Sequence, residues 1–147
     1  MTSPIRRHAR RPMSLTPLQR RRLVAAARRA ARNAYAPYSR FRVGAAVLGR
    51  SGKIYAGCNV ENASFGLTCC AERSAVFQAV AAGERRIVAV AVYTPTRQPT
   101  PPCGACRQVL REFGPRAVVL CTCQSRERIE TTLDQLLPGA FGPANLQ

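Results

Sequence analysis

Two short cysteine-containing segments constrain the fold of this chain more strongly than any other feature of its sequence. The segment PPCGAC places Cys103 and Cys106 three residues apart. If Cys103 opens a helix, the two sulfurs share one face of that helix. The free amides at a helix N-terminus favour the thiolate, so they lower the pKa of a thiol there. Such a pair is half of a zinc site, because zinc takes about four ligands and a catalytic site keeps one position for water.

Cys70 is the best candidate for the third ligand. It lies 33 residues before Cys103 and would also stand at the N-terminus of a helix. Two helix N-termini can point to one place when the helices follow adjacent parallel strands. That arrangement belongs to α/β folds, in which helices pack against a sheet.

Two charged residues follow Cys70 closely. Glu72 lies two residues further on, near the metal without needing to coordinate it, and this position suits a general base that moves a proton from water to a leaving group. Three thiolates and Zn²⁺ have a net charge of −1, which weakens the metal as a Lewis acid. Arg73 can correct this, because its guanidinium can donate hydrogen bonds to the sulfurs and withdraw charge.

The other cysteines fit structural roles better. A lone Cys-x2-Cys could also be a redox pair or half of a zinc ribbon, but a ribbon needs a second such pair. Cys69 is too close to Cys70 for that purpose and would point about 100° away around a helix. We expect Cys121 and Cys123 to be core thiols of one strand, and Cys58 to be a core thiol at the end of another.

Charge and length limit the remaining possibilities. The chain has 147 residues, as expected for one domain, and a net charge of +16, with 11 of its 23 basic residues and no acidic residue in positions 1–40. We expect 1–13 to be a disordered basic extension and 14–147 to be the folded domain. A basic arm leaves nucleic-acid binding possible, but we favour a solvated arginine-rich surface.

No apolar run reaches membrane length and no secretory signal is evident, so we expect a cytoplasmic protein without a membrane partner.

Apolar patterns and turn residues predict an α-β-β-α-β-α-β-β-α order, which is an α/β fold. A helix capped by Ser14 or Thr16 is expected to run to about Asn33. A hairpin, two strands, two helices near Cys70 and Cys103, and a last strand and helical turn follow, with these expected ranges: 41–49, 53–60, 70–83, 87–94, 103–114, 117–122, 128–132 and 133–138. We therefore predict a three-layer α-β-α sandwich around a mixed sheet of about five strands.

The whole pattern resembles a known family of enzymes. Cys70-Ala71-Glu72 and Pro102-Cys-Gly-Ala-Cys106 match the signature of zinc deaminases that act on nucleobases. The flanking segments resemble the small homotetrameric cytidine deaminases of pyrimidine salvage over about residues 15–141. The segments that carry this likeness are AYAPYSRFRVGAAV, GCNVENASFGLTCCAERSA, PPCGACRQVLREFG and LLPGAF.

The resemblance implies contacts with a nucleoside and with zinc. The residues matching Asn59 and Glu61 bind the ribose hydroxyls in that family. The residue matching Phe41 lies near the base, and the backbone at Ala71 holds the edge of the pyrimidine. The match to Gln108 supports the thiolates together with Arg73, and one Zn²⁺ is expected per subunit.

The resemblance also implies a homotetramer whose subunits share active sites. The family residue matching Phe141 reaches into a neighbouring subunit's site. Position 65 is usually tyrosine in the family and also reaches an adjacent site, so Phe65 removes one hydroxyl from that contact.

Hydrolytic deamination of cytidine and 2′-deoxycytidine to uridine, 2′-deoxyuridine and ammonia is therefore the expected function, with a free nucleoside as substrate. Three alternatives stay open from the sequence. The first is deamination of cytosine in RNA or single-stranded DNA, aided by the basic arm. The second is deamination of a cytosine-nucleoside antibiotic. The third is a zinc module that binds nucleic acid and has no catalytic activity.

Overall fold

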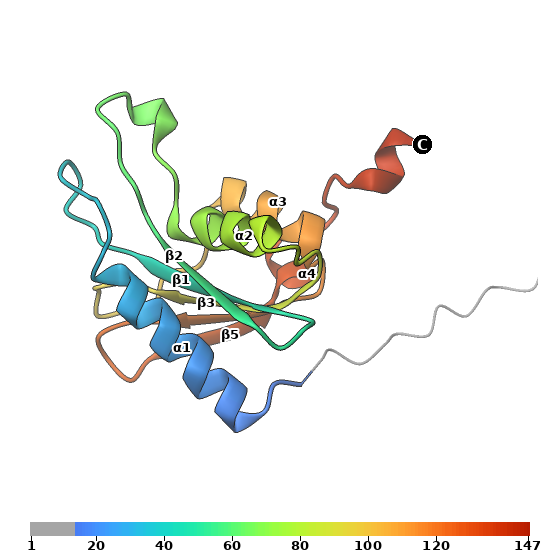
Figure 1. The fold of residues 1–147 in the computed structure, drawn as a ribbon, viewed down its shortest axis with the longest axis horizontal. Coiled ribbons are helices and arrows are strands. Elements are labelled where there is room, and N and C mark those ends of the chain that lie inside the picture. The colour runs from blue at the N-terminus through green and yellow to red at the C-terminus, as the bar shows by residue number, and fades with distance from the viewer. Residues whose placement is uncertain (1–13) are drawn as a thin grey trace, which may run out of the picture.

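A computed structural model describes residues 14–147, so the predicted basic extension at 1–13 lies outside the described residues. The described chain follows the predicted order of elements (Figure 1). Two short 3₁₀ helices, Phe65–Leu67 and Pro143–Leu146, are additions that the sequence patterns did not indicate. The main elements are α1 (Pro17–Ala31), β1 (Gly44–Gly49), β2 (Ile54–Cys58), α2 (Ala71–Ala81), β3 (Ile87–Tyr93), α3 (Gly104–Phe113), β4 (Val118–Thr122), β5 (Arg128–Thr132) and α4 (Leu133–Leu136).

The first helix starts at one of the two predicted caps. Thr16 Oγ1 accepts a hydrogen bond from the Gln19 backbone N–H at 3.1 Å, and Gln19 Oε1 accepts one from the Thr16 N–H at 3.0 Å. This reciprocal capping box satisfies amides that the helix leaves free, and Pro17 occupies the first turn, where no N–H is needed. The local sequence therefore determines where α1 begins.

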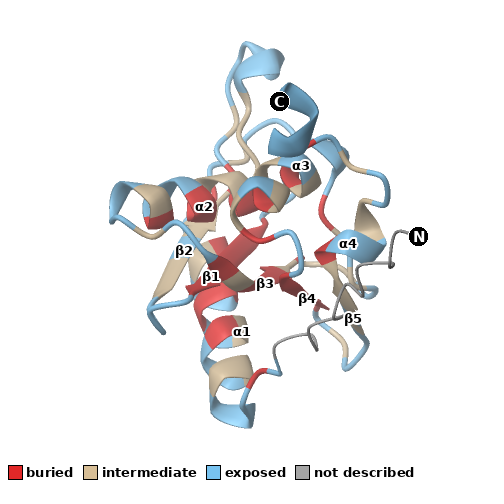
Figure 2. Cartoon of the chain, turned by 90° about the vertical axis from the view of Figure 1, so that its right-hand side faces the viewer, coloured by how far each residue is buried: buried red, intermediate tan, exposed pale blue. Residues whose placement is uncertain are grey.

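The five strands form one mixed sheet between two layers of helices. Their order is β2-β1-β3-β4-β5, and only β3 and β4 pair in parallel. Helix α1 covers one face through a cluster that includes Leu23, while α2, α3 and α4 cover the other through Val76, Leu110 and Leu133 (Figures 1 and 2). The predicted three-layer sandwich with a mixed five-stranded sheet is confirmed.

One predicted detail of the topology is wrong. Helices α2 and α3 follow β2 and β3, and these two strands run in the same direction because each pairs antiparallel with β1. They are not adjacent, because β1 lies between them. The hairpin of β1 and β2 folds back so that its first strand pairs with β3. The two helix N-termini still approach each other, since α2 and α3 pack side by side on the same face of the sheet.

Gly44 allows β1 to approach α1 closely. A Cβ atom at this position would lie 1.9 Å from the Ala27 carbonyl oxygen and 2.5 Å from the Ala31 nitrogen. Both are backbone atoms of α1, so no side-chain rotation can relieve the clash. Helix and strand could accommodate the extra carbon only by moving apart and loosening the cluster beneath α1.

We therefore expect Gly44→Ala to lower the free energy of unfolding by about 2–3 kcal/mol, as overpacking of a core does. Urea unfolding of the zinc-loaded protein measures this. Gly66→Ala is the matched control, because a Cβ there meets no atom within 4 Å, and its effect should stay within about 0.5 kcal/mol. Equal urea midpoints for the two variants would contradict the close approach of β1 and α1.

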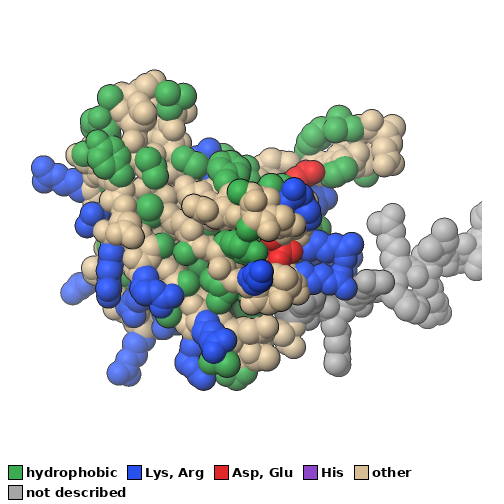
Figure 3. All heavy atoms as spheres, in the orientation of Figure 1, with side chains coloured by type: hydrophobic (Ala, Val, Ile, Leu, Met, Phe, Trp, Pro, Cys, Tyr) green, Lys and Arg blue, Asp and Glu red, His purple; other side chains and the backbone are tan. Residues whose placement is uncertain are grey.

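The surface of the described chain is strongly basic. Figure 3 shows lysine and arginine side chains distributed over the face that includes α1. Within residues 14–147 the recorded ion pair is Arg20 with Glu130, at 2.6 Å. Most of the positive charge in this region is therefore solvated rather than paired with carboxylates. None of the described helices is both long enough and apolar enough to cross a membrane.

Candidate metal centre and active site

The three predicted zinc ligands come together at the N-termini of α2 and α3. Cys70 is the N-cap of α2, Cys103 is the N-cap of α3, and Cys106 lies in the first turn of α3. Their Sγ atoms all lie within 4.8 Å of one another, with 3.9 Å between Cys70 and Cys103 and 3.4 Å between Cys103 and Cys106. Cys106 is buried and Cys103 is exposed, so the group is open to solvent on one side. The arrangement can hold one metal ion.

The charges at this group fit a cation of the zinc type. A hydrogen bond from the Cys106 thiol, followed by the neighbouring Arg73 guanidinium, lowers the pKa of Cys70 to about 5. The same hydrogen bond to Cys70 raises the pKa of Cys106 far above its ordinary value. The Cys70 and Cys106 sulfurs therefore compete for one negative charge, and a cation bound between them would relieve this competition. Soft thiolate donors at this spacing are ligands that zinc prefers.

Arg73 contacts this group directly. Its Nη2 lies 3.3 Å from Cys70 Sγ, and hydrogen bonding to that sulfur is the main cause that raises the pKa of the guanidinium above its ordinary value. The Nε atom of Arg73 is buried and has no recorded hydrogen-bond partner among residues 14–147. The side chain is thus held beside the sulfurs as a fixed positive charge.

Glu72 faces the same group from within the protein. Its side chain is only 5% exposed, and Cys106 Sγ lies 3.7 Å from Glu72 Oε2. Burial is the main cause that raises the pKa of this carboxyl group above its ordinary value. A carboxyl group with a raised pKa holds a proton more firmly than an ordinary carboxyl group, which suits a residue that takes up a proton and passes it on.

Asn59 has a structural role that the sequence did not reveal. Its Oδ1 accepts a hydrogen bond from the Val43 N–H at 2.9 Å, and its Nδ2 donates to the Phe41 carbonyl oxygen at 2.7 Å. The buried amide therefore fixes the chain just before β1. One N–H of Nδ2 stays available for another acceptor, because a primary amide has two.

Glu61 holds the preceding turn in a similar way. Its Oε1 accepts hydrogen bonds from the backbone N–H groups of Tyr38 and Ser39 at 2.9 and 3.1 Å, and its Oε2 accepts one from the Ser39 hydroxyl. The hydrogen bond from the Ser39 hydroxyl is the main cause that lowers the pKa of this carboxyl group. The carboxylate is ionised at neutral pH, and each oxygen retains acceptor capacity.

The aromatic residues predicted to contact substrate are all exposed. Phe41 is 37% exposed, Phe65 is 73% exposed and Phe141 is 58% exposed. Phe65 meets Tyr38 edge to face, with 5.6 Å between the ring centroids, on a part of the chain that stands away from the sheet.

Two further predicted residues occupy helices α2 and α3. Ala71 is the first residue of α2 and is fully buried beside Cys70. Gln108 lies on α3, and its Nε2 donates to the Phe141 carbonyl oxygen at 3.1 Å. No hydrogen bond from Gln108 to the sulfurs is recorded within the described chain, so its support of the thiolates stays a prediction.

The remaining cysteines lie outside the metal group. Cys69 pairs through its backbone with Val60, and its sulfur is 3.7 Å from the Ser74 hydroxyl. Cys121 is buried in β4, and burial raises its pKa to about 12. Cys123 is also buried but follows the end of β4 at Thr122, so the prediction that both lie within one strand is wrong by one residue.

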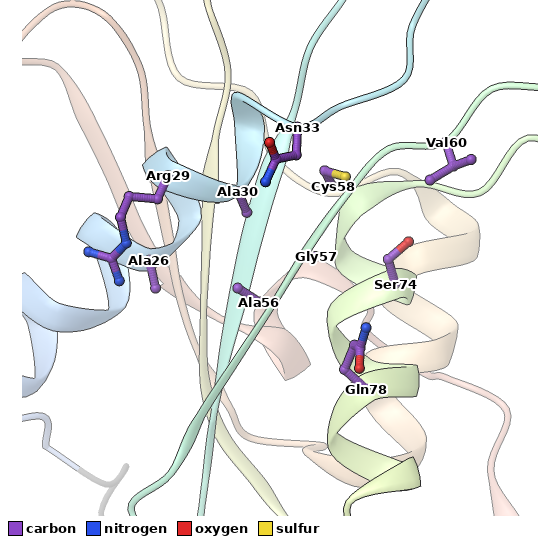
Figure 4. Close-up of a pocket in the computed structure, with 10 residues that line it drawn as sticks. All are labelled: Ala26, Arg29, Ala30, Asn33, Ala56, Gly57, Cys58, Val60, Ser74 and Gln78. Atoms are coloured by element: carbon purple, nitrogen blue, oxygen red, sulfur yellow. The ribbon is translucent and has the colours of Figure 1, made fainter.

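A pocket of about 450 Å³ lies elsewhere, between α1, β2 and α2 (Figure 4). Arg29 lines it from α1 and Asn33 from the turn that follows α1, while Ser74 and Gln78 line it from α2. None of the three metal-group cysteines is among its lining residues. The metal group lies apart from this pocket, and its exposed side at Cys103 has room for further walls.

Comparisons with known proteins agree with this geometry. Residues 18–122 match the family model described as the cytidine and deoxycytidylate deaminase zinc-binding region. A cytidine deaminase from Halalkalibacterium halodurans is 50% identical over 126 residues, which cover 84% of this chain and 95% of that protein. One from Sporosarcina psychrophila is 48% identical over 127 residues, covering 85% and 93%.

Solved structures show the same likeness. The crystal structure of a cytidine deaminase from Burkholderia pseudomallei superposes with a TM-score of 0.80 at 48% identity, covering 86% of this chain and all of that one. The crystal structure of a cytidine deaminase from Mycobacterium tuberculosis superposes with a TM-score of 0.72 at 43% identity, covering 83% and 96%. The likeness thus extends over most of the described chain, well beyond the cysteines.

Proposed function

Since this chain belongs to the cytidine deaminase family, we propose that it catalyses zinc-dependent hydrolysis of cytidine and 2′-deoxycytidine to uridine, 2′-deoxyuridine and ammonia. The observation that carries the proposal is the group of Cys70, Cys103 and Cys106 with the buried carboxyl of Glu72 beside it. We assign the reaction to 14–147, and we place the enzyme in pyrimidine salvage in the cytoplasm.

The three sulfurs would hold one zinc ion per subunit. When bound, zinc makes water a nucleophile at neutral pH, and here that water is required at C4 of the pyrimidine. Glu72 would take one proton from the water and deliver it to N3 of the base, where it stays. Glu72 would then take the second proton of the same oxygen and deliver it to the amine, which leaves as ammonia while the C4 carbonyl forms. The burial that raises the pKa of Glu72 suits this task, because a strongly acidic carboxyl group would not hold the proton.

Arg73 adjusts the electrostatics of the same site. Three thiolates would otherwise supply more negative charge than zinc neutralises. The guanidinium 3.3 Å from Cys70 Sγ withdraws part of that charge through a charge-assisted hydrogen bond. We assign Gln108 a supporting part in this role, as the family resemblance implies.

Recognition of the nucleoside uses groups that already fix the protein backbone. The free N–H of Asn59 and the remaining acceptor sites of Glu61 suit the hydroxyl groups of a ribose. We place Phe41 against the base and the backbone of Ala71 at its polar edge. Residues that are held by two or three hydrogen bonds need little further ordering when substrate binds.

A homotetramer with shared active sites would supply the missing walls. The exposed rings of Phe65 and Phe141 support this arrangement, because each would reach a neighbouring subunit's site. Light scattering measures the mass directly. A monomer at the protein concentration used for assays would contradict the proposed sharing.

The substrate assignment can be tested with purified, zinc-loaded protein and a panel of nucleosides. Loss of cytidine and 2′-deoxycytidine absorbance is expected, with no reaction of adenosine or guanosine. Removing residues 1–13 should leave kcat/KM within about twofold, since the residues assigned to the site all lie in 14–147. Zinc-loaded protein that leaves both cytosine nucleosides unchanged but deaminates cytosine in RNA or DNA would refute the proposal.

A further inference from the structure

Helix α3 does more than carry two of the three sulfurs. Arg107, the residue after Cys106, donates from Nε to the Pro102 carbonyl oxygen at 2.7 Å and from Nη1 to the Leu136 carbonyl oxygen at 2.8 Å. Pro102 immediately precedes Cys103, and Leu136 is the last residue of α4. One half-buried guanidinium therefore ties the start of the metal-binding loop to the start of the C-terminal segment.

The next turns of α3 contact that segment further along. Gln108 Nε2 donates to the Phe141 carbonyl oxygen at 3.1 Å. Arg111 Nη2 lies 3.2 Å from the position that a Cβ atom on Gly142 would take, so this guanidinium rests against the Gly142 backbone. Residues 107, 108 and 111 thus contact the C-terminal segment at positions 136, 141 and 142.

Residues 138, 139 and 141 of this segment are exposed, so few of its side chains pack against the body of the protein. The segment lies between α4 and the 3₁₀ helix Pro143–Leu146, and Gly139 has a φ of +62°, which is a turn conformation. Figure 1 shows the C-terminal part of the chain leaving the body of the protein beside α3 and α4. The Phe141 ring is mostly exposed and contributes little to holding its own backbone. Ordering each such residue costs conformational entropy, which contacts from α3 can offset.

Arg107 has the geometry required of a bridge. The carbonyl groups at the end of α4 have no partner within that helix and carry its partial negative charge, so a cation is favourable there. A planar guanidinium can donate to two carbonyl oxygens in fixed directions, which a lysine ammonium on a flexible stem cannot reproduce. The relative position of Pro102 and Leu136 is therefore set by a rigid group.

We propose that Arg107 and Gln108 are positioning residues that set the place of Phe141 for a neighbouring subunit's active site. The inference rests on the proposed function, in which Phe141 contributes to that neighbouring site. Along the chain, Cys106 binds the metal, Arg107 ties the metal loop to the C-terminal segment, and Gln108 holds the backbone of Phe141. Helix α3 thereby connects a subunit's own metal site with the Phe141 ring that this subunit contributes to a neighbouring subunit's active site.

Steady-state kinetics of single variants is the first test. Gln108→Ala should raise KM for cytidine by about 5-fold, as loss of one neutral hydrogen bond allows, whereas a loss of kcat with KM unchanged would assign Gln108 to the thiolates alone. Arg107→Ala should raise KM by at least about 10-fold, and Arg107→Lys should restore little of it. Phe141→Ala shows the KM that results when the ring itself is lost. Arg116→Ala, at an exposed residue near the segment, is the control expected to match wild type.

Mixed oligomers separate action on a neighbour from action within one subunit. Co-expressing Arg107→Ala and Glu72→Gln chains with different tags, and purifying through both tags, yields oligomers that contain both. Every competent active site then belongs to an Arg107→Ala chain, while intact C-terminal segments come from Glu72→Gln chains. We expect KM to recover toward the wild-type value. A KM that stays at the Arg107→Ala value would overturn the proposal and assign Arg107 to its own site through Pro102.

The controls distinguish this inference from the function on which it rests. A wild-type protein that does not deaminate cytidine contradicts the proposed function. Phe141→Ala with wild-type kinetics contradicts the role of Phe141. If Phe141→Ala has impaired kinetics while Gln108→Ala and Arg107→Ala match wild type, only the positioning role is contradicted. If Arg107→Ala loses zinc, the same mixing experiment with Gln108→Ala decides the matter, because the recorded contact of Gln108 is with the C-terminal segment.

Discussion

Replacement of Glu72 by glutamine is expected to lower kcat for cytidine by up to about 10⁴-fold while zinc remains bound. General acid–base groups contribute about 10²–10⁴-fold to rates, and in the proposed mechanism one carboxyl group performs every proton transfer. Glutamine keeps the size and the hydrogen-bonding shape of a protonated carboxyl group but cannot accept the proton. The buried position of Glu72 beside Cys106 gives a solvent molecule little room to take its place.

The measurement combines the loss of cytidine absorbance with the zinc content of the same sample. Glu112→Gln is the matched control, because Glu112 is exposed on α3 and should show wild-type kinetics. A Glu72→Gln protein that kept zinc and more than a tenth of kcat would remove Glu72 from the catalytic role. Loss of zinc together with activity would instead indicate that the carboxyl group holds the metal site together.

The second large effect is expected at the adjacent pair Cys69 and Cys70. Cys70→Ala should reduce bound zinc from about one ion per chain to nearly none and abolish deamination, because two sulfurs cannot hold the metal against a chelator. Cys69→Ala should keep zinc and activity, since its sulfur lies near Ser74 and outside the metal group. Neighbouring residues in the chain thus serve as variant and matched control.

Metal removal completes this test. Dialysis of wild-type protein against a chelator should abolish activity, and adding zinc back should restore it. Arg73→Gln is expected to retain the site but to bind zinc about 10–100-fold more weakly, as loss of a group that supports metal ligands does. Full activity of Cys70→Ala, or zinc loss by Cys69→Ala, would show that the wrong thiol had been assigned.

The local parts of the fold could be predicted because their causes are local. Thr16 and Gln19 mark the start of α1 through a capping box that needs only four consecutive residues. Cys70 and Cys103 stand at the N-caps of α2 and α3, where the sequence placed them. The strand boundaries were less accurate, since β1 starts at Gly44 rather than at position 41. The segment before it is held instead by Asn59, through a hydrogen bond that no local pattern reveals.

By itself, the sequence determined the order of elements, the three sulfur ligands and the residues beside them, because caps, turn residues and ligand spacing act over a few positions. Only the tertiary structure decided that β1 lies between β2 and β3, since strand pairing depends on which distant segments bury their side chains together. It also decided the second use of α3. Arg107 and Gln108 donate to carbonyl groups 29 and 33 residues further along the chain. Every residue has a backbone carbonyl, so no sequence pattern indicates which one accepts such a hydrogen bond.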